Sequence, residues 1–322
     1  MSETRLAGVL CSIAVLFSVS GLAHGQNYPN KPIRIVTAQT GGATDIIVRQ
    51  IAQGLTGSLG QQVIVDNRGG AAGAIAAQTV AKTPADGYTL LAYSSNLWLL
   101  PFLRNDVPFE FTDFAPVTLV ASSPNVLVVH PSVPVKSVRE LIVFAKARPG
   151  QLSYSSGGSG STLHLSAELF KSLAGIDIVH VPYKTGGVGL IDLLGGRVQV
   201  MFPVAAAAIP HAKTGRLRLL AVTSAEPSPL VPGVPTVAAS GLPGYASELT
   251  VGVFAPAGAS AAIVEQLNRE IVRLLTQEQT KEKFFELGLK PVGSSPEQLR
   301  STVKAEMVKW GKVIKDAAIH AD

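Results

Sequence analysis

The sequence predicts an α/β protein of two domains, each a mostly parallel sheet flanked by helices, with the chain crossing twice between them. At 322 residues the chain is long enough for two ordinary domains. Short apolar strands alternate with helical patterns, which is typical of βαβ units. Two extended runs, Ala115–Ala121 and Asn125–His130, then follow each other with no helix between them, which indicates passage from one domain to the next. A single large doubly wound sheet is the alternative on pattern alone.

Residues 26–123 are expected to form the first part of domain I. The helix expected over Thr44–Thr56 places apolar residues on one face, and the turn sequence Pro84–Gly87 leads into a strand. The expected elements are, in order, a strand over Lys31–Val36, the helix over Thr44–Thr56, a strand over Val63–Val65, a helix ending near Lys82 and a strand over Tyr88–Tyr93.

Residues 124–226 are expected to form domain II, because the alternation of strands and helices resumes after the two extended runs. The expected helices cover residues 137–147, 161–173, 187–194 and 204–214, and the expected strands are Leu152–Ser155, Ile178–Val181, Val198–Phe202 and Leu217–Thr223.

The remaining residues, 227–322, are expected to return to domain I. They begin with the proline-rich stretch Pro227–Pro235 and continue with an extended run over Leu249–Ala255. Two helices then close the chain. Ser260 caps the first helix, and Ser295-Pro-Glu297 begins the second, because serine is a good cap and proline suits the first helical position.

Composition and charge narrow the class of partner. The chain is 47% apolar and 15% charged, which is typical of a globular protein and unlike a disordered one. The formal net charge is +5, but the lysines and arginines are scattered and aromatic residues make up only 6%. The sequence therefore gives no basis for nucleic-acid binding.

The first 25 residues are expected to be a cleaved signal peptide. Arg5 precedes an apolar stretch, and Ala23 and Gly25 are small residues at the −3 and −1 positions of a cleavage site. A transmembrane anchor is the alternative, since the apolar run has about the minimum length for a span. The single cysteine, Cys11, lies in this segment. The mature chain, 26–322, would then have no disulfide and no cysteine-based metal site.

Four Gly/Ser-rich loops carry the candidate ligand-binding residues. Each follows a predicted strand and three lead directly into helices, whose first N–H groups are unpaired and attract anions. One helix end contributes only about 0.3–1 kcal/mol, whereas micromolar binding requires about 8 kcal/mol, so several loops would have to converge. Ordinary turns and caps are the alternative for each loop. The candidates are Gln39, Thr40, Gly41, Gly42, Asp45, Ser94, Ser95, Asn96, Ser155, Ser156, Gly158, Ser161, Thr162, Tyr183, Thr185 and Gly186.

No pattern of catalytic, metal-binding or cofactor-binding residues stands out. The glycine clusters fit neither the dinucleotide-binding nor the P-loop pattern, and Gly157–Ser161 has serine where GxSxG requires its last glycine. The histidines of the mature chain lack the paired spacing of metal ligands. We therefore predict no enzyme, no metal and no cofactor. Two roles stay open: His164 either supports the site or makes a local hydrogen bond, and Asp45 either orients its loop or binds a ligand amine.

A series of short segments then stands in a specific order and spacing. They are Tyr28–Arg34, Gly41–Asp45, Asp66–Arg68, Ala85–Leu91, Asp113–Val117, Gly160–His164, Val181–Lys184, Asp192–Val198, Ala221–Ser224, Val234–Thr236 and Ala255–Gly258. On these segments the chain resembles the Bug-type substrate-binding receptors of tripartite tricarboxylate transporters, through essentially all of its mature sequence.

The resemblance implies a two-domain, periplasmic-binding-protein-like fold that closes on its ligand by a hinge. It implies a small organic acid as ligand, with the carboxylate held by loop N–H groups, hydroxyls and ordered water. It also implies a monomer in the periplasm that delivers this ligand to the permease subunits of a membrane transporter without changing it. An exported sensory protein for a small anion and an exported α/β enzyme are the alternatives.

The sequence departs from the family pattern near the expected site. The loop Thr37–Thr40 is one residue shorter than usual and lacks the aromatic residue and proline that usually precede Gly41 and Gly42. Thr185 stands at a usual glycine, Val188-Gly189 at a common Pro-Ala pair, and Thr250 at a frequent tryptophan. These departures bear on which ligand is bound more than on the general role.

Overall fold

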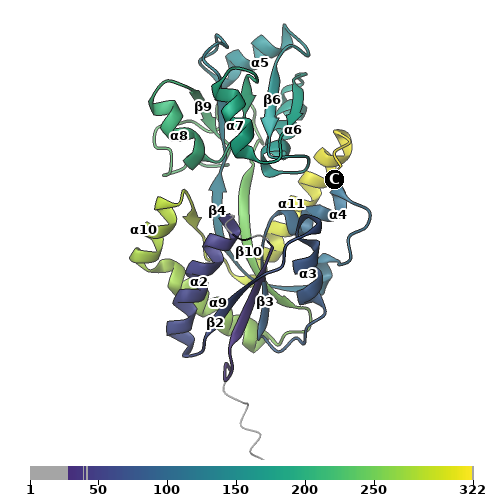
Figure 1. Ribbon diagram of the computed structural model, residues 1–322, viewed down its shortest axis with the longest axis vertical. Coiled ribbons are helices and arrows are strands. Elements are labelled where there is room, and N and C mark those ends of the chain that lie inside the picture. Colours follow the sequence, from purple (N-terminus) through teal and green to yellow (C-terminus); the bar gives the residue numbers. More distant parts are fainter. Residues whose placement is uncertain (1–27, 39, 41–42, 321–322) are drawn as a thin grey trace, which may run out of the picture.

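Two sheets, each covered by helices, form two lobes that are stacked along the long axis of the molecule (Figure 1). The computed structural model describes residues 28–38, 40 and 43–320. The expected signal peptide, residues 1–25, and the candidates Gln39, Gly41 and Gly42 lie outside these described residues. The presence of two separate sheets confirms the two-domain α/β prediction over the single doubly wound sheet.

Domain I contains a sheet with the strand order β11-β4-β10-β3-β1-β2. Its strands are β1 (Ile33–Thr37), β2 (Val63–Asn67), β3 (Thr89–Ser94), β4 (Phe114–Pro124), β10 (Glu248–Pro256) and β11 (Lys290–Pro291). Strand β1 is parallel to β2 and β3, whereas β10 is antiparallel to both β3 and β4. The return segment thus supplies an inner strand, β10, of a sheet that the first part of the chain begins.

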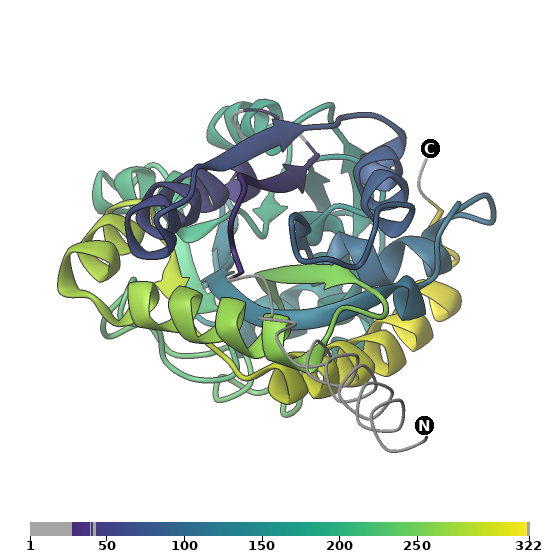
Figure 2. The same ribbon diagram turned by 90° about the horizontal axis from the view of Figure 1, so that it is seen from below.

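Helices cover both faces of this sheet. They are α2 (Ala43–Leu59), α3 (Ala74–Ala81), α4 (Asn96–Leu103), α9 (Ala261–Thr276), α10 (Glu278–Glu286) and α11 (Pro296–Asp316), with short 3-10 turns η1 (Ala71–Gly73) and η2 (Phe111–Asp113). Apolar side chains of α2 and α9, such as Ile47 and Leu267, form the core on one face. Helices α3, α4 and α11 lie on the other face (Figure 2). The core on that side includes Trp98 and Phe254. Burying one apolar stripe of each helix against the sheet is what fixes these layers.

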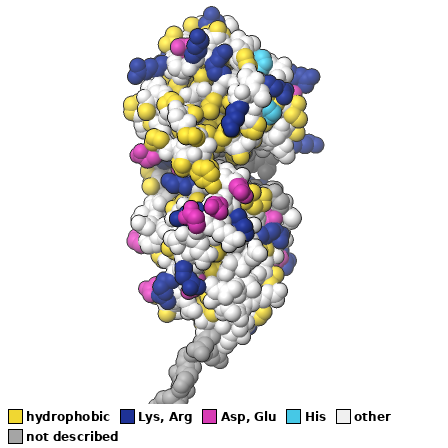
Figure 3. All heavy atoms as spheres, turned by 90° about the vertical axis from the view of Figure 1, so that its left-hand side faces the viewer, with side chains coloured by type: hydrophobic (Ala, Val, Ile, Leu, Met, Phe, Trp, Pro, Cys, Tyr) yellow, Lys and Arg dark blue, Asp and Glu magenta, His cyan; other side chains and the backbone are white. Residues whose placement is uncertain are grey.

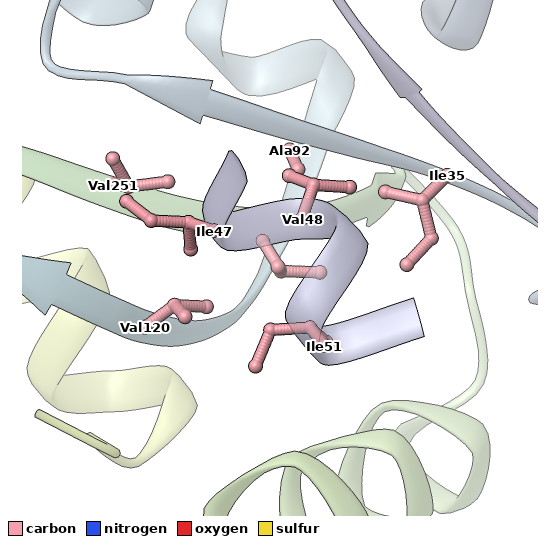
Figure 4. A pocket seen from close by; sticks show the side chains of 8 residues that line it. Ile35, Ile47, Val48, Ile51, Ala92, Val120 and Val251 are labelled. Carbon is pink, nitrogen blue, oxygen red and sulfur yellow. The ribbon is translucent and has the colours of Figure 1, made fainter. Parts of the chain in front are cut away.

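A packing gap lies inside domain I between α2 and the sheet (Figure 4). Its walls are apolar, with Ile47, Val48 and Ile51 from the helix facing Ile35 and Val251 of the sheet. The gap is too narrow for a water molecule and offers no polar group. It therefore belongs to the core and is no candidate for binding an anion.

Domain II contains a second sheet with the order β7-β6-β8-β5-β9. Its strands are β5 (Val126–Val129), β6 (Ser153–Ser156), β7 (Val179–Pro182), β8 (Val200–Met201) and β9 (Arg218–Val222). Its helices are α5 (Val138–Lys146), α6 (Thr162–Ala174), α7 (Gly186–Leu194) and α8 (Ala205–Lys213). Strand β6 is parallel to β7 and β8, and β5 runs antiparallel to its neighbours β8 and β9.

The two lobes share one continuous hydrophobic core. A single cluster of buried side chains extends from Trp98 and Phe254 in domain I through Tyr245 to Phe170 and Phe202 in domain II. Tyr245 lies in the returning segment, and its hydroxyl donates to the carbonyl of Ser166 on α6 (3.0 Å). The boundary between the lobes is therefore filled by packed side chains on the side of α6 and α11. The chain segments that cross it provide a second connection.

The chain crosses between the lobes twice. It leaves domain I at Pro124, where β4 ends, and β5 begins at Val126. On the way back, residues 228–246 still pack on domain II, since Val231 and Val237 belong to cores that contain domain II strands. The boundary at residue 226 stays a prediction; beyond it, the N–H of Val237 still donates to the carbonyl of Val222 on β9 (2.9 Å).

Two helices of the structure have no counterpart in the sequence prediction. Helix α4 is buried on almost every side and has the sequence NLWLLPFL, which shows no alternation between an apolar and a polar face. Helix α10 follows α9 after a single residue, Gln277, so that the two read as one continuous pattern. The other predicted helices are present, with ends that differ by a few residues.

Candidate ligand-binding site between the domains

The register of the strands brings the carboxyl ends of both sheets to the boundary between the lobes. In domain I, β4 ends at the crossing, and the pairing of β10 with β4 and β3 places the end of β3 at Ser94 beside Val251, near the start of β10. In domain II, β8 runs toward the crossing, where Val204 bridges Asn125. Strand β6 is parallel to both β7 and β8, so the carboxyl ends of all three strands lie on the same side of the sheet. Ligands of open α/β sheets bind outside such strand ends.

The loop between β6 and α6 provides the first set of donors. Ser161 is the N-cap of α6, and its hydroxyl accepts a hydrogen bond from the N–H of His164 (3.3 Å). This cap satisfies the third N–H of the helix, while the N–H groups of Thr162 and Leu163 have no partner within the helix. Gly158 and Gly160 have positive φ values of 103° and 76°, which only glycine adopts readily. The glycines thus allow the chain to turn sharply in front of the helix.

The loop between β7 and α7 packs directly against this first loop. A Cβ atom on Gly157 would lie 3.0 Å from the backbone nitrogen of Gly186, so the two loops are in contact. Thr185 caps α7 by accepting from the N–H of Val188 (3.4 Å), and the N–H groups of Gly186 and Gly187 again have no partner within the helix. Two helix N-termini therefore lie next to each other on the domain II side.

Tyr183 in the second loop is held by a charged neighbour. Its hydroxyl donates to Asp192 Oδ2 (2.7 Å), and Asp192 Oδ1 accepts from Arg197 (2.9 Å). The hydrogen bond from Tyr183, together with that from Arg197, holds the pKa of Asp192 below its ordinary value. The tyrosine hydroxyl is thus engaged within domain II, and what Tyr183 offers a ligand is the exposed part of its ring.

The end of β3 supplies the domain I side. The side chains of Ser94 and Ser95 are buried, and the N–H of Ser95 donates to the carbonyl of Thr250 on β10 (2.9 Å). Helix α4 starts at Asn96, with no side-chain cap on its first turn. Asn96 Oδ1 is buried and has no hydrogen-bond partner in the described residues. An amide oxygen that is buried without a partner costs free energy unless a ligand or water satisfies it.

Asp45 is engaged within domain I. Its side chain is 3% exposed, Oδ2 accepts from Arg49 Nε (3.0 Å) and Oδ1 accepts from Asn67 Nδ2 (2.8 Å). Arg49 also donates to Asn67 Oδ1 (2.9 Å), which closes a network between α2 and the end of β2. Of the two roles left open by the sequence, these contacts favour orientation of the loop before α2, in which Thr40 is exposed.

His164 lies directly behind the first loop. It is buried, and its Nδ1 accepts a hydrogen bond from the N–H of Gly160 (3.1 Å). The two roles left open for this residue therefore coincide, because the hydrogen bond is local and it also supports the loop that precedes α6.

The predicted hydroxyl groups divide into two kinds. Some bond within the protein: Ser155 donates to the carbonyl of Gly189 (3.3 Å), Ser156 bonds to His180 (2.7 Å), and Ser161 and Thr185 act as caps. In the described part of the chain no such bond engages the hydroxyls of Ser94, Ser95 and Thr162. These three hydroxyls, with the helix N–H groups, are the donors that the site can offer to an anion.

Three further buried polar groups lie near the candidate site and are not among the candidate residues, although Thr37 and Thr250 stand at departures from the family pattern. Within the described residues, Thr37 Oγ1, Asn125 Oδ1 and Thr250 Oγ1 are buried without a hydrogen-bond partner, as Asn96 Oδ1 is. Thr37 ends β1, Asn125 lies in the outgoing crossing and Thr250 is near the start of β10. All four groups thus lie at or near the boundary between the lobes.

A surface hollow of about 370 Å³ lies beside α5 in domain II, and its lining includes Val135, Arg139, Phe144 and Arg148. Within the described residues, no group of three or more His, Cys, Asp and Glu side chains could hold a metal ion, and no helix is long and apolar enough to cross a membrane. Acidic and basic side chains are interspersed on the face shown in Figure 3, where the molecule narrows between its two lobes.

Comparison with known proteins identifies close relatives over the whole chain. A family model described as the tripartite tricarboxylate transporter family receptor matches residues 47–319. BugT of Bordetella pertussis is 37% identical over 320 residues, which cover 98% of this chain and 98% of BugT. The R. palustris protein Rpa4515, solved with adipate, is 39% identical with a TM-score of 0.77, covering 91% of this chain and 99% of that one. MatC from Rhodopseudomonas palustris, solved with bound malate, is 29% identical with a TM-score of 0.72, covering 89% and 100%.

Proposed function

The chain belongs to the tripartite tricarboxylate transporter receptor family, and from this we propose that it is a solute-binding receptor that captures a small organic carboxylate between its two domains. The proposal further holds that residues 1–25 are removed on export to the periplasm. The mature receptor would act as a monomer and deliver its ligand to the permease subunits of a tripartite tricarboxylate-type transporter. It would need no cofactor and perform no chemistry.

One observation carries the proposal: uncharged donors from both lobes lie at a single boundary. The N-termini of α6 and α7 contribute N–H groups from domain II, and Ser94, Ser95 and the first turn of α4 contribute from domain I. Helix N-termini favour anions by about 0.3–1 kcal/mol each, up to ~2 kcal/mol when partly buried. Three such helix ends supply about 6 kcal/mol at the upper figure, so hydroxyl donors must add the rest of the roughly 8 kcal/mol of a micromolar ligand.

The ligands of two relatives support the choice of a carboxylate. Rpa4515 was solved with adipate and MatC with malate, both of which are dicarboxylates. The structure of this chain offers donors on both sides of the boundary, which suits an acid with a polar group at each end. Adipate and malate are therefore the first compounds to test.

The test is a thermal-shift screen on the mature chain, residues 26–322, after unfolding and refolding to remove any bound ligand. A ligand at 100 times its dissociation constant adds about 2.7 kcal/mol to the stability of the form that it binds. Each kcal/mol raises the midpoint by roughly 2–4 °C for a chain of this size class. Mono- and dicarboxylates are expected to raise the midpoint by several degrees, and neutral sugars and simple amines are not.

The control compounds decide between binding modes. If sugars or amines shift the midpoint by several degrees while a broad set of carboxylates gives no shift, the anion site is wrong and the receptor fold stands. Calorimetric titration then gives the affinity and the stoichiometry, which is expected to be one carboxylate per chain.

A further inference from the structure

Three aromatic rings are stacked behind the loop that precedes α6. Tyr154 from β6, His180 from β7 and His164 from α6 lie nearly parallel. The ring centroids of His164 and His180 are 3.9 Å apart with an interplanar angle of 12°, and those of Tyr154 and His180 are 4.8 Å apart at 15°. Residues from three elements thus meet at the base of one short loop.

Each histidine of the stack holds one end of that loop. His164 Nδ1 accepts the N–H of Gly160 at 3.1 Å, two residues before the donors of Thr162 begin. His180 Nε2 bonds to the hydroxyl of Ser156 at 2.7 Å, and the same hydroxyl accepts the N–H of Gly158 at 3.2 Å. The glycines at 158 and 160 permit the turn, but they leave the backbone free to take other shapes. The two imidazoles restrict it, together with the hydrogen bond from the N–H of Ser161 to the carbonyl of Gly158 (3.2 Å).

The hydrogen bond to Gly160 determines the protonation state of His164. A backbone N–H can only donate, so Nδ1 must be unprotonated and the proton of the neutral ring must lie on Nε2. Nε2 is 3.9 Å from Glu168 Oε1, but that carboxylate already accepts from Tyr154 and from Lys171 (2.8 Å). The groups that face His164 are therefore one carboxylate already engaged, one lysine, one tyrosine and the second imidazole.

We propose that His164 is a positioning residue: its neutral ring holds Gly160 in place, and this orients the Thr162 and Leu163 N–H groups toward the ligand. Protonation of His164 removes the acceptor, so the loop is held only while the ring is uncharged. The hold of His164 on Gly160 can be tested without any ligand. Its effect on affinity rests on the proposed carboxylate-binding function.

The electrostatic surroundings of His164 also favour the neutral ring. Burial, followed by the charge of His180, lowers the pKa of His164 from 6.5 to about 4, with Glu168 acting in the opposite sense and Lys171 in the same sense. A histidine whose folded-state pKa is lowered stabilises the fold above its unfolded pKa. That contribution is lost as the pH falls from about 6.5 toward 4. The ring is therefore neutral at pH 7.

Two variants of His164 separate its hydrogen bond from its bulk. In His164→Asn the side-chain oxygen can take the place of Nδ1 as acceptor and does not titrate, whereas His164→Leu fills space without an acceptor. His130→Leu is the matched control, because His130 Nδ1 also accepts a backbone N–H, from Ser132 (3.2 Å), outside the candidate site. Thermal unfolding without ligand checks that all three variants fold.

The experiment measures amide hydrogen exchange of Gly160 in 15N-labelled protein, together with adipate and malate affinity. At pH 7, His164→Leu is expected to speed exchange of Gly160 and to weaken carboxylate binding about tenfold, the cost of leaving a buried N–H without its acceptor. His164→Asn is expected to restore both values to within a few-fold of wild type, and His130→Leu to change neither.

Comparing the affinity of wild type with that of His164→Asn at each pH cancels the titration of the ligand itself. Near pH 4, where the wild-type ring becomes protonated, the ratio of wild-type affinity to that of the asparagine variant should fall to about half of its value at pH 7.

The experiment distinguishes failure of the positioning role of His164 from failure of the proposed function. Unchanged Gly160 exchange in His164→Leu, or an asparagine variant as impaired as the leucine variant, would overturn the positioning role. A constant affinity ratio between pH 7 and pH 4 would overturn its dependence on the neutral ring. If neither carboxylate binds the wild type, the function is wrong, and Gly160 exchange across the variants and across the same pH range still decides the role of His164.

Discussion

At the scale of single residues, neighbouring hydroxyls of the loop before α6 have different tasks. The Ser161 hydroxyl is used by the helix, since it accepts the N–H of His164, whereas no bond within the described residues engages the Thr162 hydroxyl. Thr185 repeats the arrangement at the start of α7. A cap at the third N–H orders the helix end and leaves the first two N–H groups to a ligand. In the proposed site, stability and binding would thus depend on adjacent residues.

This division predicts opposite behaviour for two alanine variants. Ser161→Ala should lower the free energy of unfolding by about 1 kcal/mol, the usual cost of losing such a cap. Thr162→Ala should leave stability nearly unchanged and weaken carboxylate binding by about 1 kcal/mol, because it removes one donor to a desolvated anion. Chemical unfolding and calorimetric titration measure the two effects. Equal affinity in wild type and Thr162→Ala would remove this hydroxyl from the site.

Two buried threonines on the central strands allow a second comparison. Thr250 Oγ1 has no partner in the described residues, whereas Thr118 Oγ1 on β4 donates to the carbonyl of Ser294 (2.8 Å). Thr250→Val should therefore be neutral or stabilising in the absence of ligand, and Thr118→Val should cost about 1 kcal/mol. With a bound carboxylate only Thr250→Val should lose affinity. A large loss of stability in Thr250→Val would show that its hydroxyl has a structural task.

Buried polar groups such as Thr37, Asn125 and Thr250 also mark where prediction from sequence ends. The Gly/Ser loops were predictable, because each joins a strand to a helix and local chemistry identifies it. Whether a threonine in a strand finds a partner depends on residues far away in the chain, as for Thr118 with Ser294. No local pattern records that. The use of the Ser155 and Ser156 hydroxyls inside domain II was hidden for the same reason.

At the scale of elements, capped amphipathic helices were predictable and fully buried ones were not. Ser260 and Ser295 cap α9 and α11 as expected, since each accepts a backbone N–H of its first turn. Helix α4 is hidden in the sequence because most of its residues are buried and they do not alternate with a polar face. Near the middle of α4, Trp98 Nε1 donates a hydrogen bond to Glu306 Oε2 of α11 (2.8 Å).

The contact between α4 and α11 predicts a pH-dependent effect of Glu306. Burial raises the pKa of Glu306, and the hydrogen bond from Trp98 and the charge of Lys309 only partly oppose this. A carboxyl whose folded-state pKa is raised destabilises the fold once it is ionised, so stability is lost as the pH rises above the ordinary glutamate range. Glu306→Gln keeps an acceptor for Trp98 and removes this cost. Its melting midpoint should be equal to wild type at pH 4 and higher at pH 8, by up to about 2–4 °C.

The exposed Glu282 of α10 provides the control for this prediction. Glu282→Gln removes the same charge from the surface and should change the midpoint little at either pH. A Glu306→Gln variant that is less stable than wild type at pH 8 would show that its ion pairing outweighs the cost of burial.

At the scale of the whole molecule, the shared core predicts how the two lobes unfold. Buried side chains from Trp98 to Phe202 form one cluster through the joint, so neither lobe can open fully without exposing part of the other. Scanning calorimetry of the ligand-free mature chain should therefore give a single transition whose calorimetric and van't Hoff enthalpies agree. Two resolved transitions would show that the lobes are energetically independent despite this contact.

The position of β10 has a consequence for the order in which the protein is made. This strand lies between β3 and β4, yet residues 248–256 leave the ribosome long after both of its neighbours and after the whole of domain II. Until then β3 and β4 each present an open hydrogen-bonding edge, and the first lobe cannot form its sheet. The strands of domain II, in contrast, come from one uninterrupted stretch of the chain. The growing chain therefore carries a first lobe with an incomplete sheet until residues 248–256 have been made.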